Sequence, residues 1–163
     1  MKADGFRQLY DYHFTVNRRI WDKCVMSLSD EQFYRELPYS IGSIHNQTVH
    51  MMSIDERWFS GLRGVALPDF LKPADYPDRA AVRWYWDEVE GQMRDYLATL
   101  TDEQLFAPLN DLQVWQVLIH VANHATDHRA QVLAMLNTMG VKTFPQDFIF
   151  HLWGIDPSEP KPT

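Results

Sequence analysis

The chain has 163 residues, of which 45% are hydrophobic and 23% are charged, a size and composition that suit one soluble domain with a substantial core. Its formal net charge is −7, and Arg18-Arg19 is its densest basic spot. Because a nucleic-acid-binding protein needs a stripe of cations along the phosphates, nucleic acid is excluded as an expected partner.

The first expected helix runs from about residue 4 to residue 28, with apolar residues repeating at three and four. Cys24, the single cysteine, falls on this apolar face, so no intrachain disulfide is possible and a buried, inert thiol is predicted. His13 and Asn17 lie one turn apart and are expected to border one cavity. The N-terminal residues lack the apolar stretch of a signal peptide, and no apolar run approaches membrane-spanning length. We therefore expect a cytoplasmic protein without a membrane partner.

The second expected helix begins after Ser43, a suitable N-cap, and ends near Leu62. His50 lies at the edge of its apolar side, whereas His45 falls on a different face and is expected to be solvated. The apolar side consists of Ile44, Met51, Ile54, Trp58 and Leu62.

A proline-containing linker over residues 64–77 separates this helix from the third, which is predicted to begin after Asp78 as its N-cap. The linker is long enough to cross over the end of a bundle. The fourth helix is expected over about residues 112–139, closed by Gly140. Period-two alternation is absent, and no Asn-Gly or Asp-Gly turn links two β-rich runs, so no strand is predicted.

These elements predict an all-α fold, a four-helix bundle with a crossover connection, in a single domain over residues 1–153. The proline-containing segment 154–163 is expected to form a loose C-terminal tail. An internal echo relates the sequence of residues 28–33 to that of residues 100–105, each with a capping Ser or Thr followed by acids. This echo is either a common helix-start motif or the trace of a two-fold repeat that would make two helical hairpins.

Two histidines in the fourth expected helix, His124 and His128, carry the main functional signal. A four-residue step places both rings on one helix face, at the inner edge of the apolar stripe. Two such imidazoles one turn apart suit a divalent metal ion, and His50 on a partner helix supplies a third ligand. The zincin motif is excluded because Ala125, and not a glutamate, follows the first histidine. His120 extends the row as a flanking residue.

Sequence stretches along nearly the whole chain support this interpretation. They are Tyr12 to Asn17, Gly42-Ser-Ile-His-Asn-Gln-Thr-Val-His50, Glu56-Arg-Trp58, Ile119-His-Val-Ala-Asn-His-Ala-Thr-Asp-His-Arg-Ala-Gln-Val132, Gly140 and Asp147-Phe148. In type and order they resemble the motifs of the DinB/YfiT-like metalloenzyme family.

The resemblance implies a four-helix bundle with a crossover and a metal ion held by His50, His124 and His128. Two positions depart from the family pattern: Ala130 stands where many relatives have Gly, and Asp127 stands where many have His. Neither change removes a ligand, although Asp127 alters the charge near the site. The resemblance also implies that members commonly form homodimers, and Trp84, which falls off the apolar stripe of its helix, agrees with a homodimer here.

Three neutral histidines leave a coordination position open, which is typical of catalytic sites, and Zn²⁺ or Ni²⁺ suits imidazole ligands. The resemblance further implies a low-molecular-weight thiol bound at the metal, which characterised relatives transfer, add to a substrate, or use to isomerise it. The expected function is therefore metal-dependent thiol transferase or hydrolase-type chemistry on a small-molecule substrate. No catalytic residue beyond the ligands is assigned, although Gln131 and Asn17 can orient a substrate.

Two alternative functions remain. One is a non-catalytic, stress-related protein with a structural metal ion, and the other is a bundle with no metal in which the histidines are core residues. His151 belongs to a C-terminal segment expected to plug the bundle.

Overall fold

The computed structural model describes residues 1–159 and consists of four long helices with short accessory elements. The all-α prediction is therefore confirmed. The long helices are α1 (Ala3–Lys23), α3 (Ile44–Leu62), α4 (Arg79–Thr99) and α5 (Val114–Thr138). The short elements are η1 (Val25–Ser27), α2 (Asp30–Tyr34), η2 (Pro73–Asp75), η3 (Gln104–Phe106), β1 (Pro108–Leu109), β2 (Leu112–Gln113) and α6 (Phe148–Leu152).

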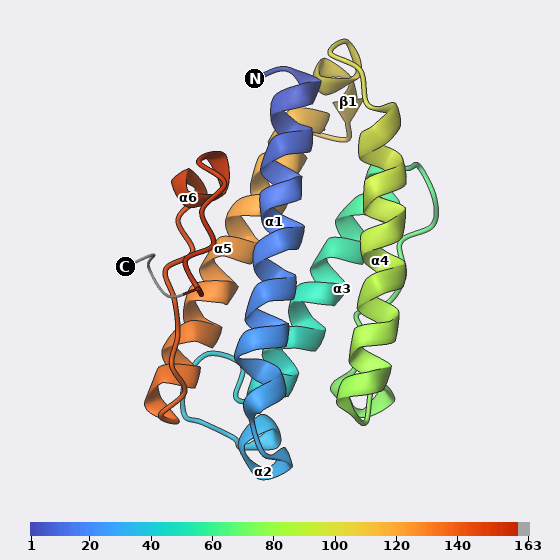
Figure 1. The fold of residues 1–163 in the computed structure, drawn as a ribbon. Helices are drawn as coiled ribbons and strands as arrows, with labels where there is room; N and C mark the ends of the chain where they lie inside the picture. The colour runs from blue at the N-terminus through green and yellow to red at the C-terminus, as the bar shows by residue number, and fades with distance from the viewer. Residues whose placement is uncertain (160–163) are drawn as a thin grey trace.

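The four long helices form a ring in which α3 packs against α4 and α5, and α1 packs against the same two helices. In Figure 1, α1 runs downward and α3 upward, the linker returns to the bottom, α4 runs upward and α5 downward. Helices α3 and α4 are consequently parallel, which requires the crossover that the long linker predicted. Among residues 1–159, none of the helices combines the length and the apolarity that crossing a bilayer requires.

The crossover loop, residues 63–78, retraces α3 from its C-terminal end back towards its start. Near the end of the helix, the amide of Val65 donates to the carbonyl of Ser60 at 3.1 Å. Two turns earlier, Ser53 Oγ accepts from the amide of Leu71 at 3.0 Å. The loop is therefore hydrogen-bonded to α3 at two points, two turns apart, and it covers one face of that helix.

The prediction that His45 is solvated is wrong, because the crossover loop covers it. His45 is only 7% exposed, and its Nε2 lies 2.8 Å from the carbonyl oxygen of Tyr76. Its ring also packs against Phe33 and Tyr34 of α2, at 5.2 and 5.0 Å between ring centroids. The hydrogen bond to the loop carbonyl satisfies the buried imidazole, which otherwise costs free energy to bury.

The first helix ends at Lys23, earlier than the predicted residue 28. The hydroxyl of Ser27 donates to the carbonyl of Cys24 at 2.7 Å, and the chain tightens into η1. Cys24 itself is 1% exposed, and burial raises the pKa of its thiol. A thiol in such surroundings is a poor nucleophile at neutral pH, as predicted.

A small hairpin precedes α5, although no strand was expected. Pro108 pairs with Gln113 and Leu109 with Leu112. The turn between them has Asn110 at φ 53°, a left-handed conformation that asparagine tolerates better than most residues. The sequence rule failed here because it required a glycine in the turn.

The C-terminal helix α6 lies against the side of α1 and does not plug the bundle, so that prediction is wrong. None of its residues is fully buried. Phe148 packs on Tyr12 of α1 at 5.0 Å between ring centroids. Residues 154–159 continue beyond it, with Asp156 paired to Arg19 at 2.9 Å, and residues 160–163 of the expected tail lie outside the described residues.

The internal echo corresponds to two reciprocal helix caps. Ser29 Oγ accepts from the amide of Gln32, and the Gln32 side chain accepts from the amide of Ser29. Thr101 and Gln104 repeat this arrangement at the start of η3. Each cap lies between two long helices. The first lies between α1 and α3 and the second between α4 and α5.

Candidate functional site

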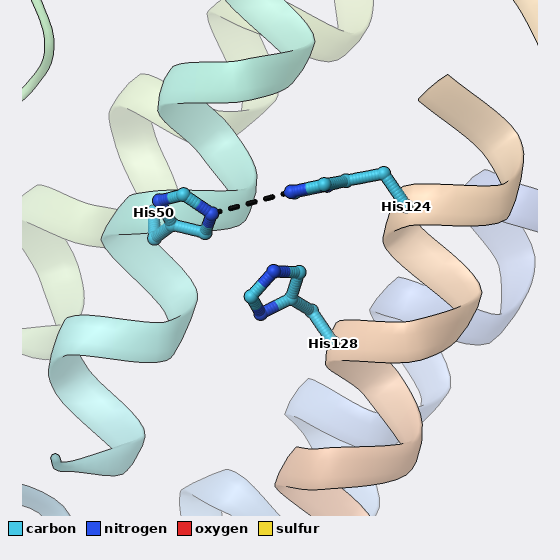
Figure 2. A group of neighbouring side chains, drawn as sticks. All are labelled: His50, His124 and His128. Carbon is cyan, nitrogen blue, oxygen red and sulfur yellow. Dashed lines mark hydrogen bonds between the residues drawn. The ribbon is translucent and has the colours of Figure 1, made fainter. Parts of the chain in front are cut away.

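Three histidine rings converge between two neighbouring long helices, as Figure 2 shows. His50 extends from α3, and His124 and His128 extend from α5. Their potential ligand nitrogens all lie within 4.8 Å of one another, and Nε2 of His50 is 3.3 Å from Nε2 of His124. The structure therefore brings together the three residues that were singled out from the sequence.

Local sequence features set the start of α3. Gly42 adopts φ 97°, which favours glycine, and a Cβ there would collide with the carboxyl group of Glu36. Ser43 then caps α3 by accepting from the amide of Asn46 at 3.0 Å. This cap fixes where α3 begins, and so fixes which face carries His50.

His128 is oriented by a hydrogen bond from its second ring nitrogen. Its Nδ1 lies 2.8 Å from Oε1 of Gln47, a fully buried residue on α3. The Gln47 side chain donates to Oε1 of Gln131 at 3.0 Å, and the Gln131 side chain donates to Oδ2 of Asp127 at 3.1 Å. Ser40 also donates to Gln131 Oε1.

The direction of this chain of hydrogen bonds follows from its carboxylate end. An ionised carboxylate only accepts hydrogen bonds, so Asp127 requires the NH₂ group of Gln131 to face it. The carbonyl oxygen of Gln131 then faces the NH₂ group of Gln47, and the Gln47 oxygen faces His128. His128 must therefore carry its proton on Nδ1, and its Nε2 presents a lone pair. Asp127, noted above as a departure from the family pattern, thus determines the tautomer of its neighbour.

The surroundings keep the three histidines neutral. Burial, with repulsion from His128 and His50, lowers the pKa of His124 from 6.5 to about 4. Burial and His128 lower the pKa of His50, and burial lowers that of His128. Asp55 raises the pKa of His50 and of His124, but burial and the neighbouring histidines lower these pKa values by more. Neutral imidazoles with free lone pairs are what a metal ion requires, because a protonated ring cannot ligate.

The donor set fits a metal ion. Two nitrogens bound to one tetrahedral Zn²⁺ at about 2.0–2.1 Å lie roughly 3.3 Å apart. His50 and His124 already place their Nε2 atoms at 3.3 Å. The hydrogen bond from His128 Nδ1 to Gln47 is the usual second contact of a metal-ligating histidine.

A buried polar cluster lies beside the histidines and joins α1, α3 and α5. His13 Nε2 is 3.2 Å from Oδ2 of Asp55 and 3.1 Å from Nδ2 of Asn17. Arg129 donates to Oδ1 of Asn17 at 3.2 Å and lies 3.4 Å from Nδ1 of His13. All four residues are less than 5% exposed. Arg129 and Asp55 contribute one charge of each sign, so the cluster stabilises its own charges.

Asn17 and Gln131 were named above as residues that can orient a substrate, and the structure shows which groups their side chains contact. Asn17 and His13 share one hydrogen-bonded cluster, and Asn17, but not His13, is among the lining residues of a cavity of about 10 Å³. Asn17 points its side chain at Arg129 and His13, where it positions protein groups. Gln131 contacts Gln47, so its side chain supports His128.

His120 is exposed and remains a flanking residue. Its ring packs against Trp58 at 5.0 Å and lies 6.0 Å from the ring of His124. His151 is on α6, where its Nε2 lies 3.4 Å from Oδ2 of Asp11. Among residues 1–159, the group of metal-ligand types that converges is His50, His124 and His128.

Sequence reasoning missed two residues of the site, Gln47 and Asp55. Both are buried on α3, where the expected core was apolar. Their signal was available: Gln47 stands three residues before His50, close to one helical turn. A polar amide at that spacing from a candidate ligand is a candidate partner for the ring on the opposite helix.

The fold and the site together define a crossover four-helix bundle with a three-histidine group between its second and fourth long helices. The chain belongs to the DinB family, whose sequence profile matches residues 1–159. It is similar to Protein DinB of Bacillus subtilis (strain 168), with 27% identity over 165 residues that cover 93% of this chain and 95% of that protein. The resemblance seen in the motifs is thereby confirmed at the level of the family.

Proposed function

We propose that His50, His124 and His128 bind one divalent metal ion, Zn²⁺ or Ni²⁺, and that the protein uses it to react with a small molecule. The observation that carries this proposal is the convergence of three neutral imidazoles, with two Nε2 atoms 3.3 Å apart. Imidazole ligands favour these ions over Fe²⁺ and Mn²⁺, which prefer at least one carboxylate.

Three protein ligands leave room for an exchangeable fourth, which supplies Lewis acidity and a site where water or a thiol is activated. The chain's own residues hold this centre in place. Gln47 fixes the tautomer and ring orientation of His128, and burial keeps His50 and His124 unprotonated. The buried cluster of Arg129, Asn17, His13 and Asp55 makes the adjoining core rigid.

The reaction we propose is thiol-dependent transfer to, or hydrolysis of, a small molecule. The open position suits a thiolate, which is both a good ligand for Zn²⁺ or Ni²⁺ and a strong nucleophile. This chain's lone Cys24 is buried and inert, so the thiol in this proposal is a low-molecular-weight one from solution.

Metal content provides the first test. Removing one of three ligands lowers affinity strongly, so His124→Ala should lose stoichiometric metal after dialysis, as measured by elemental analysis. The matched control is His120→Ala, which removes an exposed histidine from the same helix face and should keep full metal content. A His124→Ala variant with full metal content would overturn the ligand assignment.

A thiol titration provides the second test. Protein loaded with Co²⁺ or Ni²⁺ is titrated with cysteine, glutathione and coenzyme A, and the absorption spectrum is recorded. A charge-transfer band that appears with one thiol, and is missing in His128→Ala, supports thiolate ligation. If no thiol perturbs the metal and no exchangeable water occupies it, the metal has a structural role that joins α3 to α5.

A further inference from the structure

An apolar pocket of about 600 Å³ lies along α3, the helix that carries His50, outside the site described so far. It is bounded by the C-terminal half of α3, the crossover loop and the turn of the β1–β2 hairpin. Arg57 is the charged residue among its described lining residues, and the rest are mainly apolar. The lining residues used below are Ile54, Arg57, Trp58, Gly61, Leu67 and Phe70.

The pocket follows the same face of α3 that carries His50. At about 100° per residue, Ile54, Arg57 and Gly61 all fall within about 40° of His50 around the helix axis. The pocket therefore begins one turn beyond His50 and extends along α3 towards Gly61. A molecule whose end lies at the histidines has this pocket directly in its path.

Two contacts connect the pocket to the histidines. Phe70 lines this pocket and also a smaller one of about 320 Å³ whose lining includes His50. On the other side, the ring of Trp58 packs on His120, which neighbours His124. Phe70 and Trp58 thus link the pocket to the surroundings of His50 on α3 and of His124 on α5.

The wall formed by the crossover loop is held in place yet leaves apolar surface uncovered. The guanidinium of Arg57 lies 4.0 Å from the centre of the Phe70 ring and donates to the carbonyl of Pro68. Phe70 and Leu67 nevertheless remain 60% and 61% exposed. Apolar side chains gathered at a pocket and left exposed are typical of a ligand-binding surface.

We propose that the substrate of the histidine site carries an aliphatic or aromatic chain that occupies this pocket while its reactive end lies at His50, His124 and His128. This inference rests on the proposed function for the reactive end, and it names the substrate class as an extended, largely apolar small molecule. The volume lies within the range of about 300–1,000 Å³ typical of small-molecule sites.

A homologous series of n-alkanethiols, from ethanethiol to hexanethiol, tests this inference on Co²⁺-loaded protein through the charge-transfer absorption. Each added methylene that enters the pocket should strengthen binding about fourfold, the factor that corresponds to ~0.8 kcal/mol. Gly61→Leu fills the pocket from α3, and its Cβ would meet Leu67 at an ordinary 3.6 Å. This variant should bind ethanethiol normally and lose the dependence on chain length.

The matched control is Gly91→Leu, which makes the same substitution on an exposed face of α4 with no atom within 4 Å of the new Cβ. It should retain the dependence on chain length. Phe70→Ala, which removes the shared wall, should weaken hexanethiol binding several-fold and leave ethanethiol unchanged. A flat series in the native protein, or an equal slope in Gly61→Leu, overturns the inference while leaving the proposed function intact.

A metal-independent measurement separates the two proposals. Anilinonaphthalene sulfonate fluorescence is followed in metal-free protein, with hexanol as the competitor. If no thiol reaches the metal but hexanol displaces the dye from the native protein and not from Gly61→Leu, the proposed function fails and the apolar site stands. If hexanol displaces the dye equally from both proteins, or from neither, the pocket assignment is overturned.

Discussion

At the scale of single residues, Gln47 supports the site without being a candidate ligand. Its carbonyl oxygen holds His128 Nδ1 at 2.8 Å, and it is fully buried. Gln47→Leu keeps the size of the side chain but removes the acceptor, so the His128 ring can rotate or change tautomer. Loss of such a contact costs about 10–100-fold in metal affinity.

The measurement for Gln47→Leu is Zn²⁺ affinity by competition with a chromophoric chelator. Gln8→Leu, the same substitution at an exposed position of α1, is the control and should match the native affinity. Native affinity in Gln47→Leu would show that His128 does not depend on this hydrogen bond.

The histidines also give the metal-free protein a pH dependence. His124 has a pKa of about 4 in the folded chain against an ordinary 6.5, and the pKa values of His50 and His128 are lowered too. Between these pH values the unfolded chain binds more protons than the folded chain. The free energy of unfolding therefore rises with pH across this window and levels off above it.

Urea denaturation in the presence of a chelator, at about pH 5 and about pH 7.5, measures this dependence. Carboxylates also titrate at the acidic end, so the comparison is with His124→Gln, which lacks one of the histidines. The variant should gain less stability between the two pH values than the native protein. Equal gains in both proteins would contradict the assigned pKa of His124.

Predictions from the sequence were correct for residues whose arrangement depends on one helix. They were wrong or missing for residues whose contacts come from another element. The i, i+4 spacing of His124 and His128 is a property of one helix, so their shared face could be predicted. The burial of His45 depends on Tyr76, which the crossover loop brings back over α3. The hydrogen bond between Gln47 and His128 depends equally on the register of two helices, which spacing alone does not give.

At the scale of elements, the structure changes which face of α3 counts as core. Ile54, Trp58 and Leu62 belong to the apolar side expected from the sequence, yet all three are only partly buried. The fully buried face instead includes polar residues such as Gln47 and Asp55. Apolar periodicity identified the helix correctly, but it cannot distinguish a core stripe from the lining of a pocket.

The buried cluster joins three of the four long helices, so its charges should matter for stability. Asp55 is 2% exposed and is connected to the buried Arg129 through His13. Asp55→Ala removes the carboxylate of the cluster that holds the buried guanidinium, and removing one charge from such a buried set costs about 3–5 kcal/mol. Urea denaturation of the variant measures the loss.

Asp95→Ala is the control for this prediction, because Asp95 is exposed on α4. Its effect should stay within about 0.5 kcal/mol, as for most surface substitutions. A loss as small as this in Asp55→Ala would mean that the buried guanidinium is stabilised without the carboxylate.

At the scale of the whole molecule, the predicted topology was correct because the linker between the second and third long helices is long and contains prolines. Such a segment can return along the bundle and make α3 and α4 parallel, as Figure 1 shows. The sequence did not predict that the crossover loop also forms one wall of the apolar pocket. The position of this wall depends on contacts such as that between Arg57 on α3 and Phe70 in the loop, which lie on different elements.

The last prediction concerns assembly. Trp84 on α4 is 66% exposed, and its ring neighbours that of Tyr85 at 6.2 Å. Large aromatic side chains are enriched in the buried centres of protein interfaces, so we expect two copies to associate through this face of α4. Light scattering should then give about twice the monomer mass of 19.2 kDa, and Trp84→Ser should shift the mass towards that of the monomer. Trp153→Ser, at 65% exposure beyond α6, is the matched control and should remain dimeric. A native mass near 19.2 kDa at micromolar concentration would refute the homodimer.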